Sequence, residues 1–231
     1  GYTTVLFDLD HTLLDSDASH DAAFEATMRS IGLDDPWAVF ATFDAINQSL
    51  WRRVEGNELH PDEVKVRRFE ALLADCGLEG DPHDMGAAFA DGLTAHGELY
   101  PGARRLLAEL APAVQLGLVT NGIGAVQRGR LERLGLSDTF DAVVISGEVG
   151  TSKPGTAIFD LALDALGSPD RSECLMIGDN LGSDVLGGQR AGIDTVWFNP
   201  DGRSLGERRA PTYEVGALAQ IADIVAPAVR D

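Results

Sequence analysis

The chain has 231 residues, 44% of them hydrophobic and 24% charged, which is an ordinary balance for a globular protein with a substantial core. Its formal net charge of −19 argues against nucleic acid or an anionic membrane surface as a partner, because both would repel it. No apolar run approaches the roughly 20 residues that span a bilayer, and the N-terminal sequence lacks the apolar core of an export signal.

Cysteine and lysine are both scarce. The two cysteines, Cys76 and Cys174, show no metal-type spacing, so the sequence predicts a cytoplasmic protein without a disulfide framework. Lys65 and Lys153 are the only lysines, and arginine supplies the remaining positive side chains. An acidic, lysine-poor chain fits a salt-adapted organism, and it fits equally a genome that favours arginine codons.

Strands and helices alternate over most of the chain. Short apolar runs bounded by polar residues predict buried strands at Val5–Leu9, Val114–Thr120, Ala142–Ser146, Cys174–Gly178 and Thr195–Phe198. Helical patterns fall between the later strands, at Ala103–Leu110, Ala125–Leu134, Ala157–Leu166 and Asp184–Ala191. This alternation predicts an α/β fold with a Rossmann-like parallel sheet and helices on both faces.

The segment after the first strand breaks the alternation. Its amphipathic stretches are Ala22–Ile31, Val39–Val54, Pro61–Cys76 and Met85–His96, and it shows no strand pattern. We therefore expect a helical cap domain over residues 16–96, inserted into a core that comprises residues 1–15 and 97–231.

Polar clusters follow the predicted strands at their carboxyl ends. They are Asp8-Leu9-Asp10-His11-Thr12, Thr120-Asn121-Gly122, Lys153-Pro154 and Gly178-Asp179-Asn180 with Asp184. Taken alone, each cluster is typical of a turn or a helix cap. In an open parallel sheet, however, ligands bind outside the carboxyl ends of the strands, so the clusters are expected to converge on one crevice.

The residue types in these clusters are those that phosphoryl transfer through a carboxylate needs. Asp8 and Asp10 are two apart, which on a strand puts both carboxylates on one face, where they repel unless a cation or a proton intervenes. Mg²⁺ prefers oxygen ligands, and we expect Asp179 to complete its protein ligands. The positive charge on Lys153 suits a phosphate, and its place here is notable in a chain with so few lysines.

Hydrogen-bond donors complete the anion site. Thr120 and the amides around Asn121 supply donors for phosphate oxygens.

In this order, the four clusters resemble the four signatures of the haloacid dehalogenase superfamily. Asp8-Leu9-Asp10-His11-Thr12-Leu13 resembles the first, and the later clusters resemble the second, third and fourth. The helical insertion lies where caps of the first type occur. Thr120-Asn121-Gly122 and Gly178-Asp179-Asn180-Leu181-Gly182-Ser183-Asp184 are most similar to the group of pyrimidine 5′-nucleotidases and N-acylneuraminate-9-phosphatases.

The resemblance implies a role for each site residue. Asp8 would attack phosphorus, and Asp10 would protonate the leaving oxygen and then deprotonate the attacking water. Thr120, Asn121 and Lys153 would hold the phosphate. The implied Mg²⁺ site comprises Asp8, the carbonyl of Asp10, Asp179 and Asp184, the last as a further ligand or as a support for the others.

The function implied is that of a Mg²⁺-dependent phosphatase acting on small phosphate monoesters, with a pyrimidine nucleoside monophosphate as the best single candidate. We expect a monomer or a small homo-oligomer. Two other activities share the fold. A haloacid dehalogenase typically lacks Asp at the position of Asp10, whereas a phosphomutase would share every core residue. A binding protein that has kept the fold need not keep all four clusters.

The predicted cap carries side chains that could recognise a base. They are the aromatic residues Phe43, Trp51 and Phe69 and the arginines Arg52, Arg53, Arg67 and Arg68. Aromatic rings at this helical spacing are more often core than a stacking surface, whereas guanidinium groups can bond to carbonyl oxygens.

Overall fold

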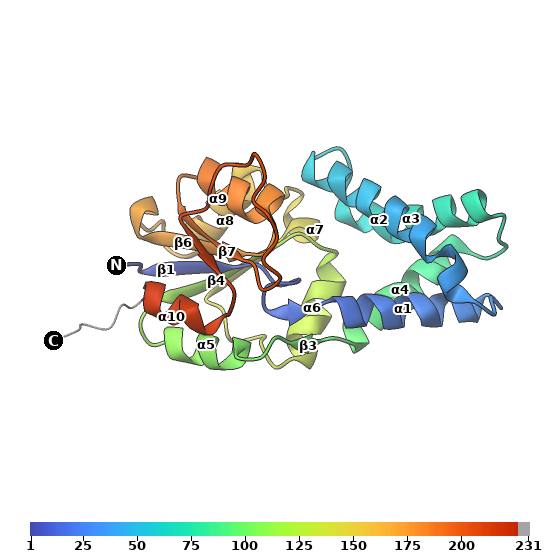
Figure 1. Cartoon of the computed structure of the whole chain (residues 1–231), viewed down its shortest axis with the longest axis horizontal. Helices are drawn as coiled ribbons and strands as arrows, with labels where there is room; N and C mark the ends of the chain where they lie inside the picture. Colours follow the sequence, from blue (N-terminus) through green and yellow to red (C-terminus); the bar gives the residue numbers. More distant parts are fainter. Residues whose placement is uncertain (226–231) are drawn as a thin grey trace.

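The computed structural model describes residues 1–225, and its centre is one parallel sheet of six strands in the order β5-β4-β1-β6-β7-β8 (Figure 1). The strands are β1 (Thr4–Phe7), β4 (Gln115–Thr120), β5 (Ala142–Ile145), β6 (Cys174–Gly178), β7 (Asp194–Phe198) and β8 (Tyr213–Val215). In the register of the sheet, Thr4 lies opposite both Gln115 and Cys174. The central strands are buried on both faces, which explains their nearly continuous apolar sequence.

Helices cover both faces of the sheet, as the predicted α/β fold requires. The helices of this part are α5 (Ala103–Leu110), α6 (Gly124–Arg133), α7 (Ser146–Val149), α8 (Thr156–Ala165), α9 (Leu186–Arg190) and α10 (Ala219–Val225). Side chains alternate along β1, so that Val5 and Phe7 enter one apolar cluster with α5, α6 and α10. Leu6 enters the other cluster with α8. The predicted fold class is therefore confirmed.

Between β2 (Leu14–Asp15) and β3 (Glu98–Leu99) the chain forms a separate group of helices. We call α1 (Asp17–Ser30), α2 (Phe40–Glu55), α3 (Pro61–Cys76) and α4 (Pro82–Ala95) the four-helix unit; a 3-10 turn, η1 (Pro36–Val39), joins α1 to α2. The unit lies beside the sheet (Figure 1) and has its own apolar cluster. Phe24, Phe43, Phe69 and Phe89 contribute rings to that cluster.

Local signals set the ends of these helices. His60 and Glu63 form a reciprocal capping box at the start of α3, where Pro61 occupies the first turn. α3 ends at Cys76 and is followed by Gly77, whose φ of 63° is in the left-handed region that glycine tolerates best. The predicted bounds of α3 agree with the structure, because residues typical of helix ends can be recognised in the sequence.

Several elements differ from the sequence-based expectation. β1 ends at Phe7 instead of Leu9, because the amides of Leu13 and Leu14 bond to the Leu9 carbonyl and close a turn there. Asp8 and Asp10 therefore lie beyond the strand and do not share a strand face. The segment expected as one helix over Asp184–Ala191 begins as a π-helix, η3 (Leu181–Val185), and continues as α9.

The C-terminal part also adds elements. β8, α10 and the short 3-10 helix η2 (Arg171–Glu173) were not predicted, and residues 226–231 of the expected core lie outside the described part. Among residues 1–225, none of the helices has the length and apolar character needed to cross a membrane.

Candidate active site

A cavity of about 660 Å³ lies where the carboxyl ends of the strands face the four-helix unit. The sheet side of its wall includes Asp8, Asp10, Asn121, Lys153 and Asp179. The wall on the four-helix unit includes His20, Phe40, Asn47, Trp51 and Arg68. Segments far apart in the sequence thus converge at one crevice.

Lys153 joins the two most buried carboxylates of the site. Its Nζ lies 2.7 Å from Asp8 Oδ1 and 2.7 Å from Asp184 Oδ1, and it donates to the Val119 carbonyl at 2.7 Å. Burial alone would lower the pKa of Lys153, but the charges of Asp184 and Asp8 outweigh it and raise that pKa. Lys153 is therefore a fixed positive charge at the base of the cavity.

Three carboxylates here form a group that suits a metal ion. Oxygen atoms of Asp8, Asp179 and Asp184 all lie within 4.8 Å of one another. Burial is the largest effect on all three carboxylates. It raises the pKa of Asp8 to about 7 and that of Asp184 as well, in both cases against the opposing charge of Lys153. It raises the pKa of Asp179 to about 6, and the charge of Asp8 adds to that rise. One buried ammonium cannot neutralise three carboxylates, and an all-oxygen donor set fits a hard divalent cation such as Mg²⁺.

The loop after β6 holds Asp179 and Asp184 in place. The Asp179 amide donates to Thr12 Oγ1 at 3.0 Å, and the Asn180 amide donates to Asp184 Oδ2 at 3.0 Å. A Cβ atom on Gly178 would overlap Asp184 Oδ2, so only glycine leaves room for that carboxylate.

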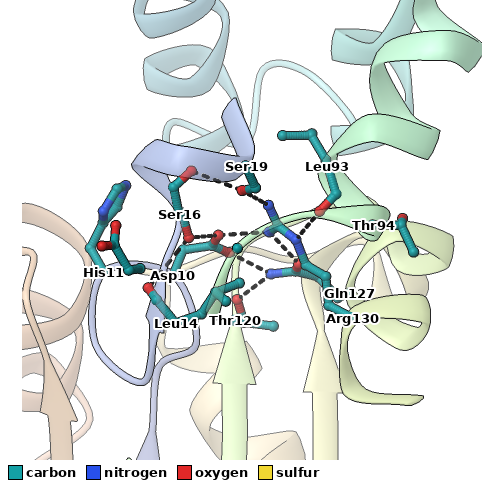
Figure 2. Close-up of polar contacts among 12 residues, drawn as sticks. Asp10, His11, Leu14, Ser16, Ser19, Leu93, Thr94, Thr120, Gln127 and Arg130 are labelled. Atoms are coloured by element: carbon teal, nitrogen blue, oxygen red, sulfur yellow. Dashed lines mark hydrogen bonds and ion pairs between the residues drawn. The ribbon is translucent and has the colours of Figure 1, made fainter. Parts of the chain in front are cut away.

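Asp10 belongs to a different charge network (Figure 2). Its carboxylate accepts hydrogen bonds from Arg130 Nη1 at 2.7 Å, from Gln127 Nε2 at 2.7 Å and from the Ser16 hydroxyl. Burial alone would raise the pKa of Asp10, but the charge of Arg130 and these hydrogen bonds hold it at about 2. Asp10 is therefore ionised in this arrangement.

Arg130 connects this network to the four-helix unit. The side chain is 4% exposed; its Nε donates to the Leu93 carbonyl of α4 at 2.9 Å, and its Nη2 donates to Ser19 Oγ of α1 at 3.1 Å (Figure 2). Sequence reasoning missed Arg130 and Gln127. Their spacing of three on a helix puts them on one face just after Thr120-Asn121-Gly122, and this pattern could have indicated them.

The side chains of Thr120 and Asn121, which were expected to bond to a phosphate, bond to other protein groups in the structure. Thr120 is fully buried at the end of β4, where its hydroxyl accepts a hydrogen bond from Gln127 Nε2 at 2.9 Å. The Asn121 side chain both donates to the Lys153 carbonyl and accepts from the Lys153 amide, each at 2.9 Å. Asn121 thus positions Lys153 through both atoms of its side-chain amide.

The molecule is thus an α/β protein in which a parallel sheet and a facing helical unit enclose a cavity lined by carboxylates and a buried lysine. The family profile of haloacid dehalogenase-like hydrolases matches residues 2–192. The chain belongs to this family.

Relatives of this chain include pyrimidine 5′-nucleotidases. The chain is 38% identical to pyrimidine 5′-nucleotidase YjjG of Escherichia coli, over 80% of this chain and 82% of that protein. It is 35% identical to pyrimidine 5′-nucleotidase PynA of Streptococcus pneumoniae, over 96% and 94% of the two chains. These similarities identify the chain as a phosphatase of the family.

A solved structure extends the similarity to the whole fold. The HAD-hydrolase YfnB of Bacillus subtilis, bound to magnesium, superposes with a TM-score of 0.86 at 34% identity and covers 97% of this chain and 98% of its own. The crystal structure of YfnB reveals interdomain movement in that protein.

Proposed function

We propose that this chain is a Mg²⁺-dependent phosphatase that hydrolyses small phosphate monoesters through a covalent aspartyl-phosphate on Asp8. The observation that carries the proposal is the position of Asp8, which faces the cavity beside Lys153 and within the cluster of Asp179 and Asp184. A carboxylate nucleophile next to a fixed cation is suited to attack on phosphorus.

The proposed reaction has two steps. A carboxylate oxygen of Asp8 attacks phosphorus, the bond from phosphorus to the ester oxygen breaks, and Asp10 gives a proton to the departing oxygen. Water then attacks phosphorus and returns a proton to Asp10, and the bond from phosphorus to Asp8 breaks to release phosphate. Because Arg130 keeps Asp10 ionised here, Asp10 must take up a proton before the first step, and this ion pair must loosen as it does so; in later cycles the proton comes from the attacking water.

The remaining residues of the site would orient the phosphate group and neutralise its charge. Lys153, together with the Thr120 and Asn121 segment, would hold the phosphate oxygens. Mg²⁺ held by Asp8, the Asp10 carbonyl and Asp179, with Asp184 as a further acid, would neutralise charge on the transferring phosphoryl group.

We propose that residues 16–96 form a cap over a core formed by residues 1–15 and 97–231.

We propose a pyrimidine nucleoside monophosphate as the substrate. A cavity of about 660 Å³ is of the size that holds a small ligand. Two relatives are pyrimidine 5′-nucleotidases, and the −19 net charge disfavours a polynucleotide. The retained Asp10, with its own set of hydrogen-bond donors, favours this activity over a dehalogenase.

Phosphate release from a panel of esters tests this function. The panel comprises dUMP, UMP, dTMP, N-acylneuraminate 9-phosphate, phosphoglycolate and hexose phosphates, each with Mg²⁺ and with EDTA. We expect release only with Mg²⁺, and a kcat/KM for a pyrimidine nucleotide about tenfold or more above the others. Full activity after rigorous chelation would contradict the metal-dependent mechanism, and a tenfold preference for a non-nucleotide would reject only the substrate.

The thermal stability of the protein should depend on Mg²⁺ and pH together. The pKa of Asp8, about 7 in the fold, exceeds its ordinary 3.8, so the folded chain keeps protons that the unfolded chain has lost. Without metal, stability is therefore lost as pH rises from about 4 to about 7. Mg²⁺ binds the ionised carboxylates, so it should raise the melting temperature by roughly 5–10 °C at pH 8 and by much less at pH 5.

The control for this measurement is NaCl at equal ionic strength, because screening of the −19 charge also stabilises the fold. The Asp179→Asn variant should lose most of the Mg²⁺-specific shift. Equal shifts with MgCl₂ and NaCl would show that the carboxylate cluster binds no Mg²⁺.

A further inference from the structure

Arg68 on α3 is a buried guanidinium on the wall of the cavity. It is 2% exposed; its Nε donates to the Val64 carbonyl at 3.0 Å and its Nη1 donates to Asn47 Oδ1 at 3.1 Å. Its Cζ lies 4.7 Å from the centre of the Phe89 ring. Within residues 1–225, Arg68 forms no salt bridge with an aspartate or glutamate.

This lack of a counterion distinguishes Arg68 from the other two cations of the cavity wall. Lys153 is paired with Asp8 and Asp184, and Arg130 is paired with Asp10. A buried charge without an opposite charge costs free energy. Burial lowers the pKa of Arg68 to about 9, which leaves it positively charged at neutral pH.

Part of the guanidinium remains available to a ligand. Within the described residues, Nη2 of Arg68 donates to no protein atom. The atom is nevertheless reachable by solvent, because it is not one of the fully buried polar atoms that lack a partner. Arginine presents its donors in a planar fork, so a group that bonds to Nη2 is held in a defined orientation.

The surroundings of Arg68 suit a planar, partly apolar leaving group. His20, Phe40 and Trp51 line the same cavity with rings, and Asn47 lines it with an amide. The other candidate arginines of the four-helix unit differ from Arg68. Arg52 and Arg53 are exposed, and Arg67 pairs with Glu63 at 2.6 Å on the outer surface.

We propose that Arg68, supported by Asn47, forms a subsite for an oxygen acceptor on the leaving group of the phosphate ester; this rests on the function proposed above. The acceptor is either a carbonyl, as on a pyrimidine base, or a carboxylate. Binding such an oxygen supplies the partner that the guanidinium lacks in the free protein, so the subsite discriminates between leaving groups.

The test compares wild type with Arg68→Met, which removes the guanidinium but keeps an apolar stem. The matched control is Arg67→Met, which changes the adjacent residue of α3 outside the cavity. The substrates are dUMP with base carbonyls, phosphoserine with a carboxylate, and phenyl phosphate with neither. We expect kcat/KM for at least one acceptor-bearing substrate to fall about tenfold or more, and that for phenyl phosphate to stay within about twofold.

The pattern of losses identifies the acceptor. A loss for dUMP alone assigns a carbonyl, and a loss for phosphoserine alone assigns a carboxylate. Equal losses for all three substrates, or no loss at all, would overturn the subsite. Should Arg68→Met not fold, Asn47→Ala gives the same comparison with a smaller loss, because it frees the guanidinium to move.

Binding without turnover separates this inference from the proposed function. Calorimetric titration with uridine, serine and phenol needs no chemistry at phosphorus. Uridine or serine is expected to bind wild type more tightly than Arg68→Met, whereas phenol binds both alike. If no phosphate is released but this difference appears, the phosphatase proposal fails and the subsite stands; if turnover occurs without the difference in binding or in kcat/KM, the subsite alone fails.

Discussion

Asp8→Asn is expected to reduce phosphate release by several orders of magnitude, because an amide cannot form the covalent bond to phosphorus. The substitution keeps the shape of the side chain and an oxygen that can accept from Lys153, which lies 2.7 Å from Asp8 Oδ1 in the structure. The fold should persist. Since burial raises the pKa of Asp8 to about 7, a neutral side chain there should stabilise the metal-free protein above that pH.

The measurement is kcat with the best substrate of the panel, together with a melting curve of the metal-free protein. Asp21→Asn serves as the matched control, since Asp21 also lines the cavity but is exposed and lies on α1. It makes the same change of charge without touching the carboxylate cluster. Near-normal turnover by Asp8→Asn would end the covalent mechanism.

Lys153→Met should damage both activity and stability. It removes the ammonium that pairs with Asp8 and Asp184, and breaking a buried pair from one side costs about 3–5 kcal/mol. The two carboxylates, whose pKa values are already raised, can take up protons at low pH. Stability of the variant should therefore fall as pH rises from 5 to 8, and kcat/KM should drop about a hundredfold or more as the phosphate loses its cation.

The chain offers a close control, because its other lysine is Lys65 on α3. Lys65→Met removes an equal charge from a side chain that forms no salt bridge within the described residues. Urea unfolding at pH 5 and at pH 8 measures how much unfolding free energy each variant loses relative to wild type. Similar costs for the two variants would mean that Lys153 does not compensate the buried carboxylates.

The sheet was predictable because its signals are local. Each central strand is an apolar run between polar residues, and the rule that ligands bind at carboxyl ends then predicted one shared crevice. The end of β1 was harder to predict, because Leu9 continues the apolar run although its carbonyl closes a turn. β8 and α10 are short and carry no comparable pattern.

The convergence of the aspartates and the lysine on one cavity was predictable, but the hydrogen-bond partners of Asp10 were not. Arg130 is 120 positions away from Asp10, and the two meet only because β4, which leads into α6, pairs with β1 in the sheet. The sequence also could not distinguish Arg68 from Arg67. Adjacent residues of a helix point about 100° apart, and which of them faces a cavity depends on how α3 packs against α2 and α4.

The hydrogen bond from Arg130 to the main chain of α4 affects how freely the sequence of the four-helix unit can change. Its Nε bonds to the main-chain carbonyl of Leu93, an acceptor that any amino acid at position 93 would also provide. This hydrogen bond between α4 and Arg130, the residue paired with Asp10, therefore does not depend on which side chain stands at position 93. Residues of the four-helix unit that line the cavity, such as Arg68 and Asn47, can therefore change in evolution while the bond between Arg130 and α4 is kept.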